Sequence, residues 1–129
     1  MNTLLLCSAT LVLLYAALSL NVSRMRLRRR KFPEVAEADM TKAIRAHGNA
    51  GEYIPLFVAI FLYVNSTQPS PSAYLIAVAV LATASRVAHA AGMFRVANVT
   101  ERHPLRFYGA LGTYISLFAL GGLLLLRAF

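Results

Sequence analysis

The sequence predicts an all-α polytopic membrane protein with a bundle of four transmembrane helices. Of its 129 residues, 58% are hydrophobic and 14% are charged, whereas soluble domains carry about 25% charged residues. Four apolar segments follow one another along the chain, each close to the roughly 20 residues that a spanning helix needs. The basic residues gather on what would be one side of a membrane. These observations together predict a single membrane domain over residues 1–129.

The four segments differ in the polar residues that they carry. The first and the fourth carry no charge. The second has polar residues at its start, and its helix is expected to begin ahead of the bilayer, near residues 33–37. The third is interrupted by Arg86 and His89. The segments cover about residues 3–22, 44–64, 73–94 and 107–126.

The distribution of lysine and arginine predicts the orientation of the chain. The stretch RMRLRRRK (24–31) follows the first segment, whereas NSTQPSPS (65–72), between the second and third segments, holds no basic residue. If both termini face away from the cytoplasm, every Lys and Arg except Arg127 lies on the cytoplasmic side, where such residues collect. We therefore expect a multi-pass integral protein of a bacterial inner membrane or an endomembrane, with both termini non-cytoplasmic.

Charge and cysteine content exclude several classes of protein. A net charge of +8 would suit nucleic-acid binding, but the clustering of the charge beside an apolar segment favours a membrane surface, so no nucleic-acid partner is expected. The single cysteine, Cys7, excludes a disulfide within the chain. The sequence shows no Cys and His spacing that suits a metal and no Gly-rich phosphate loop.

The stretch RAHGNAGEYIP, which begins at Arg45, places polar residues where a helix is expected to enter the membrane. At about 100° per residue, Asn49 lies roughly 40° from Arg45, and Glu52 lies roughly 20° from it on the other side, so all three share one face. Tyr53 lies at the edge of that face. Polar groups in a membrane helix face the bundle interior or a water-lined cleft and mark functional sites. Pro55 is expected to kink the helix just beyond them.

Two interpretations of this polar face follow from its charges. The face could serve only to hold helices together, with Arg45 and Glu52 pairing with Arg86 or Glu101 of other helices. Against this, the same side of the membrane carries more arginines than Glu52 neutralises. A surplus of guanidinium favours an anionic ligand, because its fork of donors matches carboxylate or phosphate. Anionic lipid headgroups compete for the basic cluster at 28–31.

The same residues resemble those of a known family. RAHGNAGEYIPLF resembles the signature of the MAPEG family, the membrane-associated proteins of eicosanoid and glutathione metabolism, because its Arg-x-x-x-Asn-x-x-Glu spacing is matched in full. RLRRRKF resembles the basic end of that family's first helix, and PLR (104–106) resembles the site of its thiol-activating arginine. The resemblance covers essentially the whole chain. It implies a homotrimer of four-helix protomers, with glutathione bound as cosubstrate between neighbouring protomers near the cytosolic face.

The resemblance also implies roles for individual residues. Arginines suit the carboxylates of glutathione, Glu52 suits its ammonium, and a further arginine beside the sulfur would stabilise the thiolate. Arg106 is the first choice for that catalytic arginine, and Arg102 is the second. The tyrosines of the family's third helix are not matched, because Met93 and Phe94 stand near the expected place. The implied glutathione ligands are Arg26 (or Arg24), Arg45, Asn49, Glu52 and Tyr53.

Three further features receive structural or auxiliary roles. His89 lies three residues after Arg86 and therefore shares its face, and it is interpreted as a hydrogen-bonded structural residue. Tyr108, shortly after Arg106, is a candidate to replace a missing tyrosine. A ridge of small residues on the fourth segment allows close packing in lipid, within the chain or at a trimer interface. This ridge consists of Gly109, Gly112, Thr113 and Ser116.

We expect an enzyme, a glutathione transferase that conjugates the glutathione thiolate to lipophilic electrophiles, with peroxidase activity as a further possibility. Its partners would be other copies of the chain in a homotrimer, membrane lipids and a lipophilic small-molecule substrate. The alternative is a non-catalytic accessory protein on the same scaffold that binds glutathione or lipid without turnover. A small four-helix multidrug exporter is disfavoured, because residues 1–22 contain no acidic residue.

Overall fold

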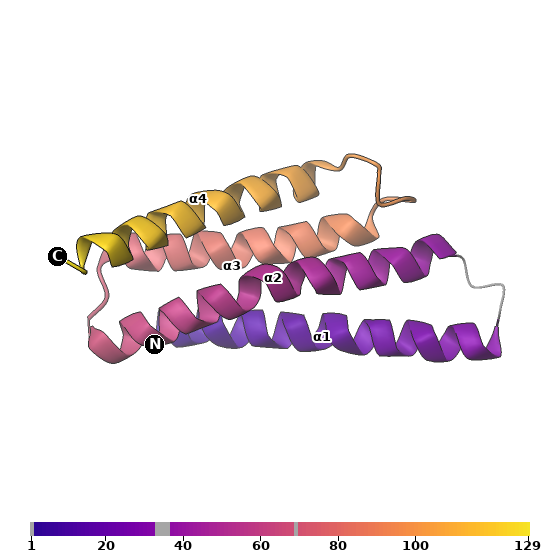
Figure 1. Cartoon of the computed structure of the whole chain (residues 1–129), viewed down its shortest axis with the longest axis horizontal. Coiled ribbons are helices and arrows are strands. Elements are labelled where there is room, and N and C mark those ends of the chain that lie inside the picture. Colours follow the sequence, from indigo (N-terminus) through magenta and orange to yellow (C-terminus); the bar gives the residue numbers. More distant parts are fainter. Residues whose placement is uncertain (1, 33–36, 69) are drawn as a thin grey trace.

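Four long helices make up the computed structural model, which describes residues 2–32, 37–68 and 70–129. Figure 1 shows the helices lying along one common axis and alternating in direction, so that both termini lie at the same end of the bundle. The α3–α4 connection lies at the opposite end (Figure 1). In chain order the helices are α1 (Thr3–Lys31), α2 (Glu37–Thr67), α3 (Ala73–Phe94) and α4 (Pro104–Leu126).

Side chains just ahead of three helices cap their first turns. The Asn2 Oδ1 atom accepts a hydrogen bond from the backbone N–H of Leu5 at 3.1 Å, and the Ser72 Oγ atom accepts one from Leu75 at 3.3 Å. At α4, the His103 Nδ1 atom accepts from the backbone N–H of Leu105 at 3.2 Å. These acceptors satisfy backbone donors that a helix start leaves without partners.

Two helices extend beyond their apolar segments, as expected from the basic end of the first helix and from PLR (104–106) at the start of the last one. The helix α1 does not end with the apolar run at residue 22 but continues to Lys31. Arginine and lysine are good helix formers, and cations at a helix C-terminus interact favourably with its dipole. The helix α4 begins at Pro104, three residues ahead of its apolar segment, because proline suits the first position of a helix.

Three of the helices, α1, α3 and α4, are long and apolar enough to cross a membrane. The helix α2 falls outside that set because its first half carries the polar face that begins at Arg45. It runs without a break through Pro55, and Figure 1 shows it changing direction near its middle. A bend is the expected effect of a proline inside a helix.

The apolar interior is formed by side chains from all four helices. Phe57 and Phe61 of α2 are fully buried, with ring centroids 5.9 Å apart, and they lie in one cluster with Leu11 of α1, Ala79 of α3 and Leu120 of α4. Outside this cluster, many large apolar side chains are exposed on the bundle surface. Such a surface suits contact with lipid or with another membrane chain.

The ridge of small residues on α4 packs against α3 of the same chain. A Cβ atom added at Gly109 would lie 2.7 Å from the backbone oxygen of Ser85 and 2.7 Å from the backbone nitrogen of His89. The side chains of Thr113 and Ser116 are also fully buried. The packing role is therefore confirmed, and it is exercised within one chain.

Candidate functional site

The polar face of α2 lines a cavity together with residues from α3 and α4. The cavity has a volume of about 380 Å³. From α2 it receives Arg45, Asn49 and Glu52, which are the three residues that the helical spacing placed on one face. From α4 it receives Arg106. We call this space the stripe cavity; its remaining lining residues are Ile44, Gly48, His89 and Met93.

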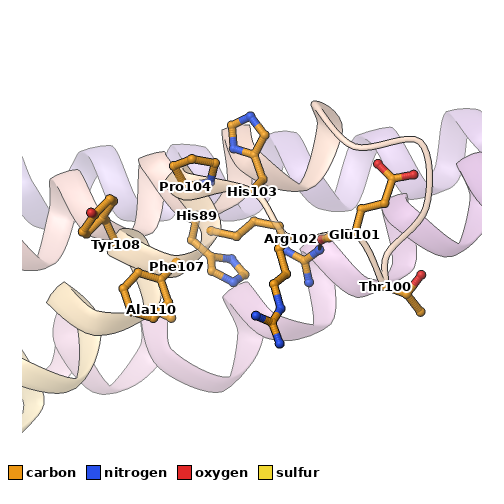
Figure 2. Close-up of a pocket in the computed structure, with 10 residues that line it drawn as sticks. His89, Thr100, Glu101, Arg102, His103, Pro104, Phe107, Tyr108 and Ala110 are labelled. Carbon is orange, nitrogen blue, oxygen red and sulfur yellow. Dashed lines mark hydrogen bonds between the residues drawn. The ribbon is translucent and has the colours of Figure 1, made fainter.

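A larger cavity of about 770 Å³ adjoins it at the α3–α4 connection (Figure 2). We call it the loop cavity. His89 and Arg106 line both this cavity and the stripe cavity, whereas Arg102 lines only this one. Much of its lining is apolar or aromatic, including Phe107 and Tyr108, whose rings meet edge to face at 5.4 Å. The two cavities therefore share one basic side chain, Arg106, and one imidazole.

The side chain of Arg86 lies at the centre of the bundle and is only 1% exposed. Its Nη2 atom donates a hydrogen bond to the Asn49 Oδ1 atom at 2.7 Å, and its Nη1 atom donates to the Thr113 Oγ1 atom at 3.4 Å. The guanidinium carbon lies 5.0 Å from the centroid of the Tyr53 ring, a cation–π distance. Arg86 thus connects α3 to both α2 and α4.

No carboxylate pairs with Arg86 among the residues that the structure describes. The ion pairs in that part of the chain join Arg29 to Glu37 at 2.6 Å and Lys42 to Asp39 at 2.7 Å. The idea that Arg45 and Glu52 form ion pairs with Arg86 or Glu101 therefore finds no support in these ranges. The Glu101 Oε2 atom instead accepts a hydrogen bond from the backbone N–H of Ala97 at 3.1 Å.

Arg106 is held in place by the connection that precedes it. Its Nη1 atom donates hydrogen bonds to the backbone oxygens of Val99 and Glu101, both at 2.7 Å. Gly92 of α3 allows the first turn of α4 to come close, because an added Cβ atom would lie 2.8 Å from the Arg106 backbone nitrogen. The position of Arg106 between the two cavities is thus fixed by backbone contacts on both sides.

The other predicted site residues are distributed differently. Arg102 is exposed and lies away from the polar face of α2. Arg26 is exposed on α1 and lines none of the three cavities described in this section. Tyr53 does not line the stripe cavity; its hydroxyl lies 3.4 Å from the hydroxyl of Tyr114. The roles of these residues remain predictions.

Two residues of α3 contribute more to the cavities and to the contacts between helices than the sequence indicated. His89 was interpreted as a structural residue, but it lines the stripe cavity, the loop cavity and a third cavity of about 80 Å³ beside Arg86. Among the described residues its Nδ1 atom has no hydrogen-bond partner although it is buried. Arg86 was considered only as one of many cations and as a possible structural partner of the polar face. The signal that pointed to both was their spacing of three residues, which is one turn of an apolar helix.

The fold and the site define a class: an all-α membrane protein whose basic, carboxylate-bearing site is built between α2, α3 and α4. A sequence model of the MAPEG family matches residues 4–126, and the chain belongs to that family. It is therefore a multi-pass four-helix membrane protein related to glutathione and eicosanoid metabolism. Searches of curated proteins and of solved structures found no match.

Proposed function

We propose that this protein binds glutathione in the stripe cavity and transfers it to lipophilic electrophiles. The observation that carries the proposal is the meeting of two groups of residues from distant parts of the chain. Arg45, Asn49 and Glu52 come from α2, Arg106 comes from the start of α4, and all four line one cavity. The volume of about 380 Å³ falls in the range of roughly 300–1,000 Å³ that is typical of small-molecule sites.

The polar groups of the cavity match those of glutathione. Glutathione carries two carboxylates, an ammonium and a thiol. The guanidinium of Arg45 suits a carboxylate, because it offers paired donors in one plane. The carboxylate of Glu52 is not in an ion pair among the described residues, and it suits the ammonium.

Arg106 suits the role of thiol activation because it lines both cavities. A guanidinium beside the sulfur favours the thiolate over the thiol. In the proposed step the thiol releases its proton to solvent water, and the sulfur of the thiolate gives an electron pair to an electrophilic carbon of a substrate in the loop cavity. A carbon–sulfur bond forms as the leaving group departs with its bonding pair. The protein contributes positioning and stabilisation of charge.

The proposal includes a homotrimer with its sites near the cytosolic face. The two cavities are lined by the first half of α2, the last turns of α3, the connection after it and the start of α4. Figure 1 shows these parts toward the end of the bundle opposite the termini, where α1 also ends with its basic last turn. That arrangement agrees with non-cytoplasmic termini, because basic connections collect in the cytoplasm. Arg26 is exposed on its own protomer and would contact glutathione held at the junction with a neighbouring protomer.

The proposal is tested by titration of the purified protein in detergent with glutathione, followed by conjugation assays with a panel of lipophilic electrophiles. Calorimetry should show saturable binding, and chromatography should show the thioether product. An absence of glutathione binding would contradict the proposal. S-methyl glutathione serves as a control, because it offers the same polar groups without a thiol and should bind without giving product.

Two observations favour the second candidate, a non-catalytic accessory protein. Arg106 Nη1 is occupied by two backbone oxygens, and Met93 lines the stripe cavity near the place where the resemblance led us to expect a tyrosine. Both features reduce the number of donors available to a thiolate. Glutathione binding without any conjugation across the panel would favour this candidate.

A further inference from the structure

The contact between Arg86 and Asn49 fixes the orientation of an amide group. A guanidinium has five N–H donors and no acceptor. The Asn49 atom that lies 2.7 Å from Arg86 Nη2 must therefore be the oxygen, Oδ1. The amide nitrogen, Nδ2, is the atom that Asn49 can offer elsewhere. Asn49 lines the stripe cavity, whereas Arg86 does not.

Arg86 is itself held firmly on the side away from the stripe cavity. Its side chain is 1% exposed, so it has little room to turn. Thr113 on α4 accepts a hydrogen bond from Arg86 and donates one to the backbone oxygen of Gly109 at 2.7 Å. The Tyr53 ring lies 5.0 Å from the guanidinium carbon. The direction of the Asn49 amide is thus set by contacts that reach both α2 and α4.

The charge of Arg86 favours the same kind of ligand in the stripe cavity as its hydrogen bond to Asn49 does. Its direct partners in the described ranges are an amide, a hydroxyl and an aromatic ring. The carboxylate of Glu52, which lines the stripe cavity, acts on it electrostatically but forms no ion pair with it. A buried charge without a directly paired counter-ion is unfavourable. An anionic group in the adjoining stripe cavity would partly relieve that cost, and a neutral group would not.

We propose that Arg86 is a positioning residue that sets the specificity of the glutathione site. It turns the Asn49 amide so that this amide presents only its N–H donors to the stripe cavity. The charge of Arg86 also favours an anion there. Arg86 therefore selects a carboxylate of glutathione over a neutral amide at Asn49. This inference rests on the proposed function, since it concerns the same cavity and the same ligand.

The test compares the affinities of three ligands: glutathione and two analogues in which one or the other carboxylate is a primary amide. For the wild type, at least one analogue should bind about tenfold or more weakly than glutathione, the scale of one charged hydrogen bond. In Arg86→Met, which removes charge and donors but keeps an apolar stem, the ratio of the affinity for glutathione to the affinity for that analogue should fall to about threefold or less. Arg86→Lys, which keeps the charge, should restore part of the ratio.

The matched control is Arg95→Met, because Arg95 is an exposed arginine at the end of the same helix and lines none of the three cavities. It should keep the ratio of the wild type. A purely structural role of Arg86 would weaken all three ligands alike and leave the ratio unchanged. That outcome would overturn the inference while leaving the proposed function intact. A wild type that binds no glutathione would overturn both.

A second variant keeps the inference testable if Arg86→Met does not fold. Asn49→Asp has the same shape, and its carboxylate would pair with Arg86, so the protein should unfold at a higher temperature than the wild type. The variant no longer carries a donor, so glutathione affinity should fall about tenfold or more. Asn98→Asp, at an exposed position in the α3–α4 connection, is the control. Unchanged glutathione affinity in Asn49→Asp would overturn the inference.

Discussion

The Arg86 Nη2 atom donates a hydrogen bond to the Asn49 Oδ1 atom at 2.7 Å, across a separation of 37 residues in the chain. The contact joins α3 to the polar face of α2 inside the bundle. Because polar groups in the apolar interior of a membrane bundle are costly without partners, such contacts determine how neighbouring helices align. The stripe cavity lies next to this contact, so its shape depends on the same alignment.

Replacement of Glu52 by glutamine should weaken glutathione binding while leaving the fold intact, because Glu52 is exposed in the bundle. We expect a loss of about 1.5–3 kcal/mol, the scale of a hydrogen bond to a charged group, or roughly tenfold to a hundredfold in affinity. Calorimetric titration measures the change. Glu37→Gln, which removes the partner of Arg29, is the control and should bind as the wild type does. Equal affinity in both variants would exclude Glu52 as a ligand.

Replacement of Arg106 by leucine should change the bound thiol more than the affinity. Since its guanidinium would stabilise the thiolate, Arg106→Leu should raise the pKa of the glutathione thiol in the complex and keep the affinity within a few-fold. Ultraviolet absorbance of the thiolate, followed against pH, measures this directly. Arg127→Leu, at the other end of α4, is the control.

The same titration distinguishes between the two candidate arginines. If Arg102→Leu shifts the thiol titration and Arg106→Leu does not, the activating role belongs to Arg102. If neither variant shifts it and the wild type forms no thiolate at neutral pH, the accessory role replaces the transferase role.

Purified protein should assemble as a trimer in detergent. The mass of the protein part should be about three times the 14.1 kDa of one chain. Light scattering combined with refractive index measures this mass free of the detergent contribution. A stable monomer that still binds glutathione would refute a site shared between protomers.

Reporter fusions should place the two ends of the bundle on opposite sides of the membrane. A fusion at Phe129 should report the non-cytoplasmic side, and an insertion after Phe32 should report the cytoplasm, because the basic residues lie beside the latter position. A cytoplasmic signal from Phe129 would reverse the orientation and remove the site from the cytosolic face.

Replacement of Gly109 by alanine should destabilise the bundle. The new methyl group would lie 2.7 Å from the backbone of both Ser85 and His89, and overpacking of this kind costs about 1–3 kcal/mol. Gly121→Ala is the matched control, because no atom lies within 4 Å of its added Cβ. Thermal unfolding should show a lower midpoint only for the first variant; equal midpoints would mean that the α3–α4 contact is looser than the structure has it.

Much of the fold follows from hydropathy alone. The apolar run at 73–94 predicted α3 with its bounds, because a spanning helix must satisfy its own backbone and can end only where turn-forming or polar residues return. Hydropathy alone does not locate the end of α1, since the segment after residue 22 loses its apolar character but not its helical propensity. Hydropathy marks the membrane boundary, and the helix boundary lies farther along.

The geometry of the candidate site was predictable where it depends on one helix and not where it depends on several. Spacing along α2 brought Arg45, Asn49 and Glu52 together, and all three line one cavity. Nothing local indicated that Tyr53 would turn toward Tyr114 or that Asn49 would meet Arg86. Those contacts arise from the way α2, α3 and α4 pack, which one helix's periodicity does not determine.

The length of α1 has a consequence for the depth of the protein in the bilayer. Its 29 residues span about 44 Å at about 1.5 Å per residue, whereas the hydrocarbon core is about 30 Å thick. A tilt of about 20° shortens that span by only a few ångströms. The last turns of α1, with Arg28 and Arg30, must therefore extend through the headgroup region and beyond it as a continuous helix. Because charged turns resist being drawn into the acyl chains, this end of α1 limits movement of the protein along the membrane normal.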